Sequence, residues 1–138
     1  MDSAASDHTI LLIDDSKVSR SLIKVFLMGR SFVFLEAEDG IGGLQTVQQR
    51  IDESKAIDLV IADMNMPAMD GLTFVKKLRA DKRPQMRTLD VVLLTSDTSE
   101  QLRKEALAVG VCAVVYKPVS SAEKPLQQAI ERALAKRR

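Results

Sequence analysis

The sequence predicts an α/β fold in which five parallel strands form one sheet with helices on both faces. The first observation behind this prediction is a set of five short apolar runs, in which polar residues do not alternate with apolar ones. Such runs are typical of strands that are buried on both faces of a parallel sheet. The second observation is that longer segments with helical spacing separate the runs. Parallel strands need crossover segments of this kind, so the alternation favours repeated β–α units.

The apolar runs define the predicted strands in chain order. They are residues 10–13, 32–35, 57–62, 91–94 and 113–116. The remaining segments are long enough for helices, which we place at residues 17–30, 39–51, 71–80, 99–109 and 121–136. In the fourth helix, Leu102, Ala106 and Val109 keep helical spacing, and Gly110 follows where a C-terminal glycine is favoured.

Two local patterns qualify the helix predictions. Gly40, Gly42 and Gly43 weaken the second helix, because each glycine in a helix interior costs roughly 1 kcal/mol relative to alanine. Thr98 and Gln101 have the spacing of a capping box at the start of the fourth helix.

The length predicts one domain, which we place at residues 9–135, between a polar tail at 1–8 and a basic tail at 136–138. A hydrophobic content of 46% excludes a mostly disordered chain, and a net charge of +1 gives no general attraction to nucleic acid or anionic membranes. We expect the basic stretch from Lys76 to Arg87 to be a solvated helix end and loop. No secretory signal or membrane span is expected, and a lone cysteine excludes an internal disulfide, so we expect a cytoplasmic protein.

Polar residues follow four of the predicted strands. Asp14 and Asp15 follow the first, Asp63 the third, Thr95 the fourth and Lys117 the fifth. The carboxyl ends of parallel strands meet at one edge, where ligands bind to open α/β sheets. Three carboxylates at that edge repel one another, and a hard divalent cation such as Mg²⁺ would relieve the repulsion. With an ammonium and a hydroxyl for an anion, the set predicts phosphoryl transfer to an aspartate.

These residues resemble the receiver domain of two-component response regulators, in particular the stand-alone chemotaxis type. The resemblance extends from Thr9 to Leu134, and its most specific part is the string from Asp63 to Leu72. It implies a flavodoxin-like fold with strand order 2-1-3-4-5. It also implies that Asp63 accepts a phosphoryl group from a phosphohistidine of a histidine kinase or a histidine phosphotransfer protein.

The resemblance assigns the other site residues as well. It implies a Mg²⁺ site in which Asp15, Asp63 and the Asn65 backbone carbonyl bind the metal directly, while Asp14 contributes through water. Thr95 and Lys117 would bind the phosphoryl group, and a cis peptide bond would precede Pro118. The chain departs from the family pattern at Val114, where the family usually has an aromatic residue that rotates with the threonine.

The function expected is a phosphorylation-dependent switch that binds a protein target, with slow self-dephosphorylation rather than true enzymatic turnover. One alternative is a receiver fragment of a multidomain regulator. An Asp-nucleophile phosphatase is disfavoured, because it needs a carboxylate two residues after Asp63, where this chain has Asn65. A flavin or dinucleotide binder is also disfavoured, because Asp14 and Asp15 would repel phosphate in the absence of metal.

The first predicted helix carries more apolar surface than one sheet face requires. Ile23 and Leu27 lie on a stripe that the family pattern places in the core. A second stripe is expected to be partly exposed near the site and to dock helices that present a phosphohistidine; it consists of Val18, Leu22 and Val25. The alternative is that this stripe packs on the last helix through Ile130 and Leu134.

Overall fold

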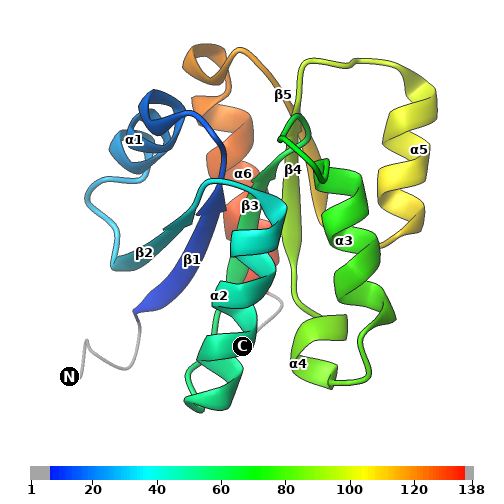
Figure 1. Ribbon diagram of the computed structural model, residues 1–138. Coiled ribbons are helices and arrows are strands. Elements are labelled where there is room, and N and C mark those ends of the chain that lie inside the picture. Colours follow the sequence, from blue (N-terminus) through cyan, green and yellow to red (C-terminus); the bar gives the residue numbers. More distant parts are fainter. Residues whose placement is uncertain (1–6, 136–138) are drawn as a thin grey trace.

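The computed structural model describes residues 7–135, and its centre is a five-stranded sheet in the order β2-β1-β3-β4-β5 (Figure 1). All neighbouring strands run parallel, which confirms the predicted α/β fold and strand order. The strands are β1 (His8–Ile13), β2 (Phe32–Ala37), β3 (Leu59–Asp63), β4 (Val91–Thr95) and β5 (Ala113–Tyr116).

Helices cover both faces of the sheet. They are α1 (Lys17–Phe26), α2 (Gly40–Asp52), α3 (Gly71–Ala80), α4 (Pro84–Arg87), α5 (Glu100–Ala108) and α6 (Glu123–Ala135), with a 3₁₀ turn, η2 (Val119–Ser121), before α6. One core joins α2, α3 and α5 to side chains such as Leu11 and Ile13 of β1. The other joins α1 and α6 to the alternate residues Ile10 and Leu12 (Figure 1). Strand geometry sends successive side chains to opposite faces, so one strand serves both cores.

Side-chain caps fix where the longer helices begin. Ser16, Asp39 and Asp70 accept hydrogen bonds from backbone amides three residues ahead, at 3.1, 2.7 and 2.7 Å. At α5 the cap is Ser99, whose hydroxyl accepts from the Leu102 amide at 3.3 Å. The predicted capping box at Thr98 is therefore wrong by one residue.

Several boundaries differ from the prediction. Helix α1 ends at Phe26 rather than at residue 30, because the chain turns at Gly29, whose φ of +90° favours glycine. Strand β2 lies at the sheet edge, so Val33 is 44% exposed and burial on both faces was wrong for this strand. His8, expected in the N-terminal tail, opens β1. Residues 1–6 and 136–138, the remainder of the two expected tails, lie outside the described residues.

The glycines of α2 allow close packing on β1. A Cβ atom at Gly43 would collide with the side chain of Ile13 and would lie 3.2 Å from Phe74 Cε1. The low helix propensity at this position is therefore offset by the close approach of helix and sheet.

In the basic stretch from Lys76 to Arg87, Arg79 of α3 connects two other segments of the chain. Its guanidinium donates hydrogen bonds to four backbone carbonyl oxygens at 2.8–3.0 Å, those of Arg87, Leu89, Val109 and Gly110. Arg87 ends α4 and Leu89 lies between α4 and β4, whereas Val109 and Gly110 follow α5. The predicted helix end and loop are present as the end of α3 and residues 81–83, whereas α4 was not predicted. Within residues 7–135, no helix has the length and apolar character needed to cross a membrane.

Candidate functional site

The end of β1 contributes two carboxylates with different surroundings. Asp14 is 3% exposed, whereas Asp15 is exposed. The Ser16 amide donates to Oδ1 of Asp14 at 2.8 Å, while the buried Oδ2 has no hydrogen-bond partner. A buried carboxylate oxygen without a partner is costly, so its position suits a bound cation.

Asp63 ends β3 and is also 3% exposed. Its Oδ1 lies 2.7 Å from Nζ of Lys117, and the Asn65 amide donates to the same oxygen at 3.4 Å. Burial raises the pKa of Asp63 above its ordinary value, and the negative charge of Asp14 raises it further, whereas Lys117 lowers it. The balance is upward, so the folded protein disfavours an ionised Asp63 unless more positive charge is near.

Thr95 and Lys117 complete the predicted set. Thr95 is buried at the end of β4, and its hydroxyl accepts from the Asp97 amide at 3.0 Å. The Lys117 amide donates to the Thr95 carbonyl at 2.8 Å, which joins the ends of β4 and β5. The expected cis peptide bond between Lys117 and Pro118 is confirmed.

The three carboxylates form one cluster. Asp14, Asp15 and Asp63 each offer a carboxylate oxygen, and these atoms lie within 4.8 Å of one another. Oδ2 of Asp14 has no hydrogen-bond partner, and the pKa of Asp63 is raised by burial first and by the charge of Asp14 second, so a divalent cation would relieve both groups. Oxygen ligands are those that Mg²⁺ prefers, so the donor set fits this metal.

Gly71 is a site residue whose importance the sequence analysis missed. A Cβ atom at this position would lie 2.6 Å from the Asp63 carbonyl oxygen and 2.6 Å from Leu93 Cδ1. The Gly71 amide donates to the carbonyl of Met64 at 2.8 Å, which closes the loop after β3 against the start of α3. In the sequence, Gly71 stands out only as part of the string from Asp63 to Leu72 and as the first residue of the predicted helix at 71–80.

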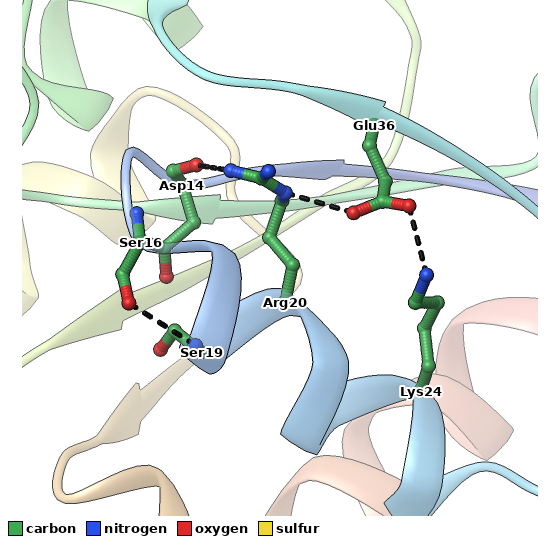
Figure 2. A network of polar contacts seen from close by, with 6 residues as sticks. All are labelled: Asp14, Ser16, Ser19, Arg20, Lys24 and Glu36. Carbon is green, nitrogen blue, oxygen red and sulfur yellow. Dashed lines mark hydrogen bonds and ion pairs between the residues drawn. The ribbon is translucent and has the colours of Figure 1, made fainter.

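Arg20 was also missed, although it lies beside Asp14, one member of the acidic cluster (Figure 2). Its guanidinium donates to the backbone carbonyl of Asp14 and, at 2.8 Å, to Oε1 of Glu36 on β2. The signal in the sequence is a cation on the inward stripe of α1, three residues before Ile23 and seven before Leu27.

Two other predicted features of the surroundings can be located. Val114, which replaces the usual aromatic residue, is half-buried and packs against the core that contains α3 and α5. On α1, Val18 is 78% exposed and Val25 is 55% exposed, while Leu22 is half-buried. The partial exposure of this stripe is confirmed, as is the burial of Ile23 and Leu27 in the core.

Comparisons with known proteins match most of the chain to one family of domains. The family model described as "Response regulator receiver domain" matches residues 10–131. The chain is 31% identical over 114 residues to the chemotaxis protein CheY-3 of Vibrio cholerae, a match that covers 82% of each chain. It is also 31% identical over 115 residues to the sensor histidine kinase CheAY of Helicobacter pylori, with 83% of this chain covering 14% of that protein. The solved structure of the chemotaxis response regulator CheY4 of Vibrio cholerae has a TM-score of 0.73 at 30% identity, covering 88% of this chain and 98% of that chain.

Proposed function

The chain belongs to the response regulator receiver domain family, whose members are phosphorylation-dependent signalling switches, and from this premise we propose that Asp63 is its phosphoryl acceptor. The donor is a phosphohistidine of a sensor histidine kinase or a histidine phosphotransfer protein. The observation that carries the proposal is the buried Asp63 carboxylate, paired with Lys117 at 2.7 Å and clustered with two further carboxylates.

In the proposed transfer, an oxygen of Asp63 forms a bond to phosphorus. The bond between phosphorus and the histidine nitrogen breaks, and the nitrogen keeps the electron pair and takes up a proton. Lys117 supports the reaction because it favours the ionised form of Asp63, and its ammonium, 2.7 Å from Asp63 Oδ1, would lie close to a phosphoryl group on this residue.

A magnesium ion would supply positive charge that neutralises the transferring phosphoryl oxygens. The proposed ligands are the carboxylates of Asp14, Asp15 and Asp63 and the backbone carbonyl of Asn65. Asp14 and Asp63 enter this set from the ends of two adjacent strands, β1 and β3, so the sheet itself holds them together.

The switch itself is proposed to use the loop after β4. The Thr95 hydroxyl, which accepts from the Asp97 amide, would turn to a phosphoryl oxygen and draw the exposed residues 96–99 with it. Val114 has no ring to rotate, so we expect the loop to move while position 114 keeps its rotamer. The output is binding to a protein target, with slow self-dephosphorylation and no enzymatic turnover.

The exposed stripe of α1 is the proposed contact for the phosphodonor protein. Val18 begins it three residues after Asp15, and Val25 extends it two turns along the helix. Helices that present a phosphohistidine would pack on this apolar surface beside the reaction centre. The exposure of Val18 and Val25 supports this proposal over packing against α6.

Two alternatives receive less support. A phosphatase needs a second carboxylate two residues after the nucleophile, and Asn65 is found there. A receiver within a longer regulator remains compatible with the match to CheAY, whose other activities are not carried over to this chain. The proposal includes the cytoplasmic location expected from the sequence.

The test is incubation with acetyl phosphate and Mg²⁺, followed by intact mass measurement. We expect one phosphoryl group on the wild type and on Asp52→Asn, a control that alters an exposed carboxylate at the end of α2. Asp63→Asn, or removal of divalent metal, should abolish the mass increase. Labelling that persists in Asp63→Asn would exclude Asp63 as the acceptor.

A further inference from the structure

Arg20 is a buried cation that joins α1 to the loop of the acidic site. It is 8% exposed, and a guanidinium so deeply buried is costly unless its donors are used. Figure 2 shows it between Asp14 and Glu36, with one nitrogen on the Asp14 carbonyl and Nε on a Glu36 oxygen. Both contacts are to acceptors outside α1, so the side chain works as a bridge.

The Asp14 main chain is fixed from two sides by the same edge strand. Its amide donates to the carbonyl of Ala37 at 3.1 Å, and its carbonyl accepts from Arg20, which Glu36 holds. Ala37 and Glu36 are consecutive residues of β2. These contacts, together with the Ser16 amide on Oδ1, determine where the Asp14 carboxylate lies.

Glu36 is itself held by two cations. Arg20 Nε lies 2.8 Å from Oε1, and Lys24 Nζ lies 2.8 Å from Oε2. Lys24 and Arg20, in this order of effect, lower the pKa of Glu36 below its ordinary value. Glu36 therefore stays ionised at neutral pH. Its Oε1 accepts from Arg20, which bridges to Asp14, and its Oε2 accepts from the more exposed Lys24.

We infer that Arg20, oriented by Glu36, is a positioning residue that sets the Mg²⁺ affinity of the carboxylate cluster through the Asp14 main chain. The inference rests on the proposed function, in which these carboxylates bind Mg²⁺. Residues behind the ligands of a metal site commonly change metal affinity by about 10- to 100-fold when they are replaced. Here the residue acts on the backbone of a ligand rather than on its side chain.

Electrostatics alone predicts the opposite sign. Arg20 is a positive charge beside the cluster, so simple repulsion means that its removal should tighten Mg²⁺ binding. If Arg20 acts by positioning Asp14, its removal should weaken Mg²⁺ binding, because Asp14 loses the contact that holds its carbonyl. The direction of the change therefore decides between the two effects.

The experiment is a calorimetric titration of Mg²⁺ into the wild-type full chain and three variants at about pH 7. We expect Arg20→Met to weaken binding about 10-fold, and Arg20→Lys, which keeps the charge without the planar fork, to weaken it in the same direction. Lys24→Met is the matched control, because it removes the other partner of Glu36 and leaves the bridge to Asp14. Its affinity should stay within about twofold of the wild type. Unchanged or tighter binding by both Arg20 variants would overturn the inference.

Amide hydrogen exchange on the metal-free protein separates this inference from the proposed function. We expect the amides of Asp14 and Ser16 to exchange about 10-fold faster in Arg20→Lys than in Lys24→Met, because the loop loses its anchor. A wild type that binds no Mg²⁺ would contradict the proposed function, and the exchange rates would still decide the positioning role. A wild type that binds Mg²⁺ and is phosphorylated, with equal exchange in both variants, would overturn this inference alone.

Discussion

Lys117 Nζ and Asp63 Oδ1 lie 2.7 Å apart, although β5 and β3 are separated in the sheet by β4. The lysine side chain therefore crosses the end of β4, where Thr95 is buried. Three strand ends are joined by one ion pair and one backbone hydrogen bond, from the Lys117 amide to the Thr95 carbonyl. A phosphoryl group on Asp63 would be added at the centre of this arrangement.

Replacing Lys117 should separate metal binding from switching. We expect Lys117→Met to bind Mg²⁺ with at least the wild-type affinity, because the carboxylates remain and a competing cation is lost. Phosphorylation-driven binding to a protein target should fall by about 10-fold or more, since the phosphoryl group loses its ion pair. Calorimetry and a target-binding assay would measure the two effects. Normal target binding by the phosphorylated variant would contradict the role of Lys117.

Asp63 should make stability depend on pH in a defined direction. Its pKa is raised above 3.8, so the folded chain binds more protons than the unfolded chain just above that pH. The free energy of unfolding should therefore decrease as pH rises from 3.8 through the raised pKa. Without divalent metal, Asp63→Asn should be more stable than the wild type at about pH 7, and the difference should shrink toward acid pH. Urea unfolding at several pH values measures this, and a less stable variant at neutral pH would exclude it.

Arg79 should contribute strongly to stability from outside the site. Arg79→Met removes hydrogen bonds to four backbone carbonyls in two loops, some of them partly buried. We expect the free energy of unfolding to fall by about 2 kcal/mol in urea unfolding. Lys76→Met, on an exposed position of the same helix, should change it by less than about 0.5 kcal/mol. Equal effects of the two substitutions would mean that the Arg79 contacts are weak.

The exposed stripe of α1 can be tested without disturbing the core. Val18→Asp should slow phosphoryl transfer from a histidine phosphotransfer protein by about 10-fold, because a charge replaces apolar contact area. Labelling by acetyl phosphate should be unchanged, since this small donor needs no docking surface. Leu22 is a poorer choice, because it is half-buried against the α1–α6 core.

The matched control for this stripe is Ile41→Asp, which alters a 49% exposed apolar residue on α2, on the other face of the sheet. Its transfer rate should equal that of the wild type. If Val18→Asp slows acetyl phosphate labelling and protein-mediated transfer equally, the stripe is not a docking surface.

The site was predictable because strand ends are visible in the sequence. An apolar run followed by Asp, Thr or Lys marks both a buried strand and the residue at its carboxyl end, which placed Asp14, Asp63, Thr95 and Lys117 correctly. The parallel topology then brought them together without any knowledge of side-chain contacts.

The contacts that support the site were not predictable in the same way. The sequence shows Arg20 as a cation on the inward stripe of α1, but its partners, Glu36 and the Asp14 carbonyl, are not set by helical spacing. Gly71 depends on the distance between α3 and β3, which the sequence does not contain.

Short elements and helix ends were missed for a different reason. Helix α4 has four residues, which is too short to show a periodic pattern. Thr98 and Ser99 are both acceptable N-cap residues for α5. The helix starts after Ser99 because the backbone at Ser99 is extended and the Asp97 carboxylate accepts a hydrogen bond from the Ser99 amide at 2.8 Å.

The pairing of the first and last helices on one face has a consequence for synthesis of the chain. Helix α6 contacts α1 through a hydrogen bond from Gln127 to the Phe26 carbonyl, and it contacts the turn between α1 and β2 through an ion pair between Glu131 and Arg30. On the ribosome, residues 17–27 emerge long before residues 123–135. Ile23 and Leu27 therefore lack their packing partners on α6 while the rest of the sheet is being synthesised. Apolar surface exposed for this interval is a target for chaperones and for aggregation. Helix α6, with its 13 residues, can therefore complete this core only after it has been synthesised.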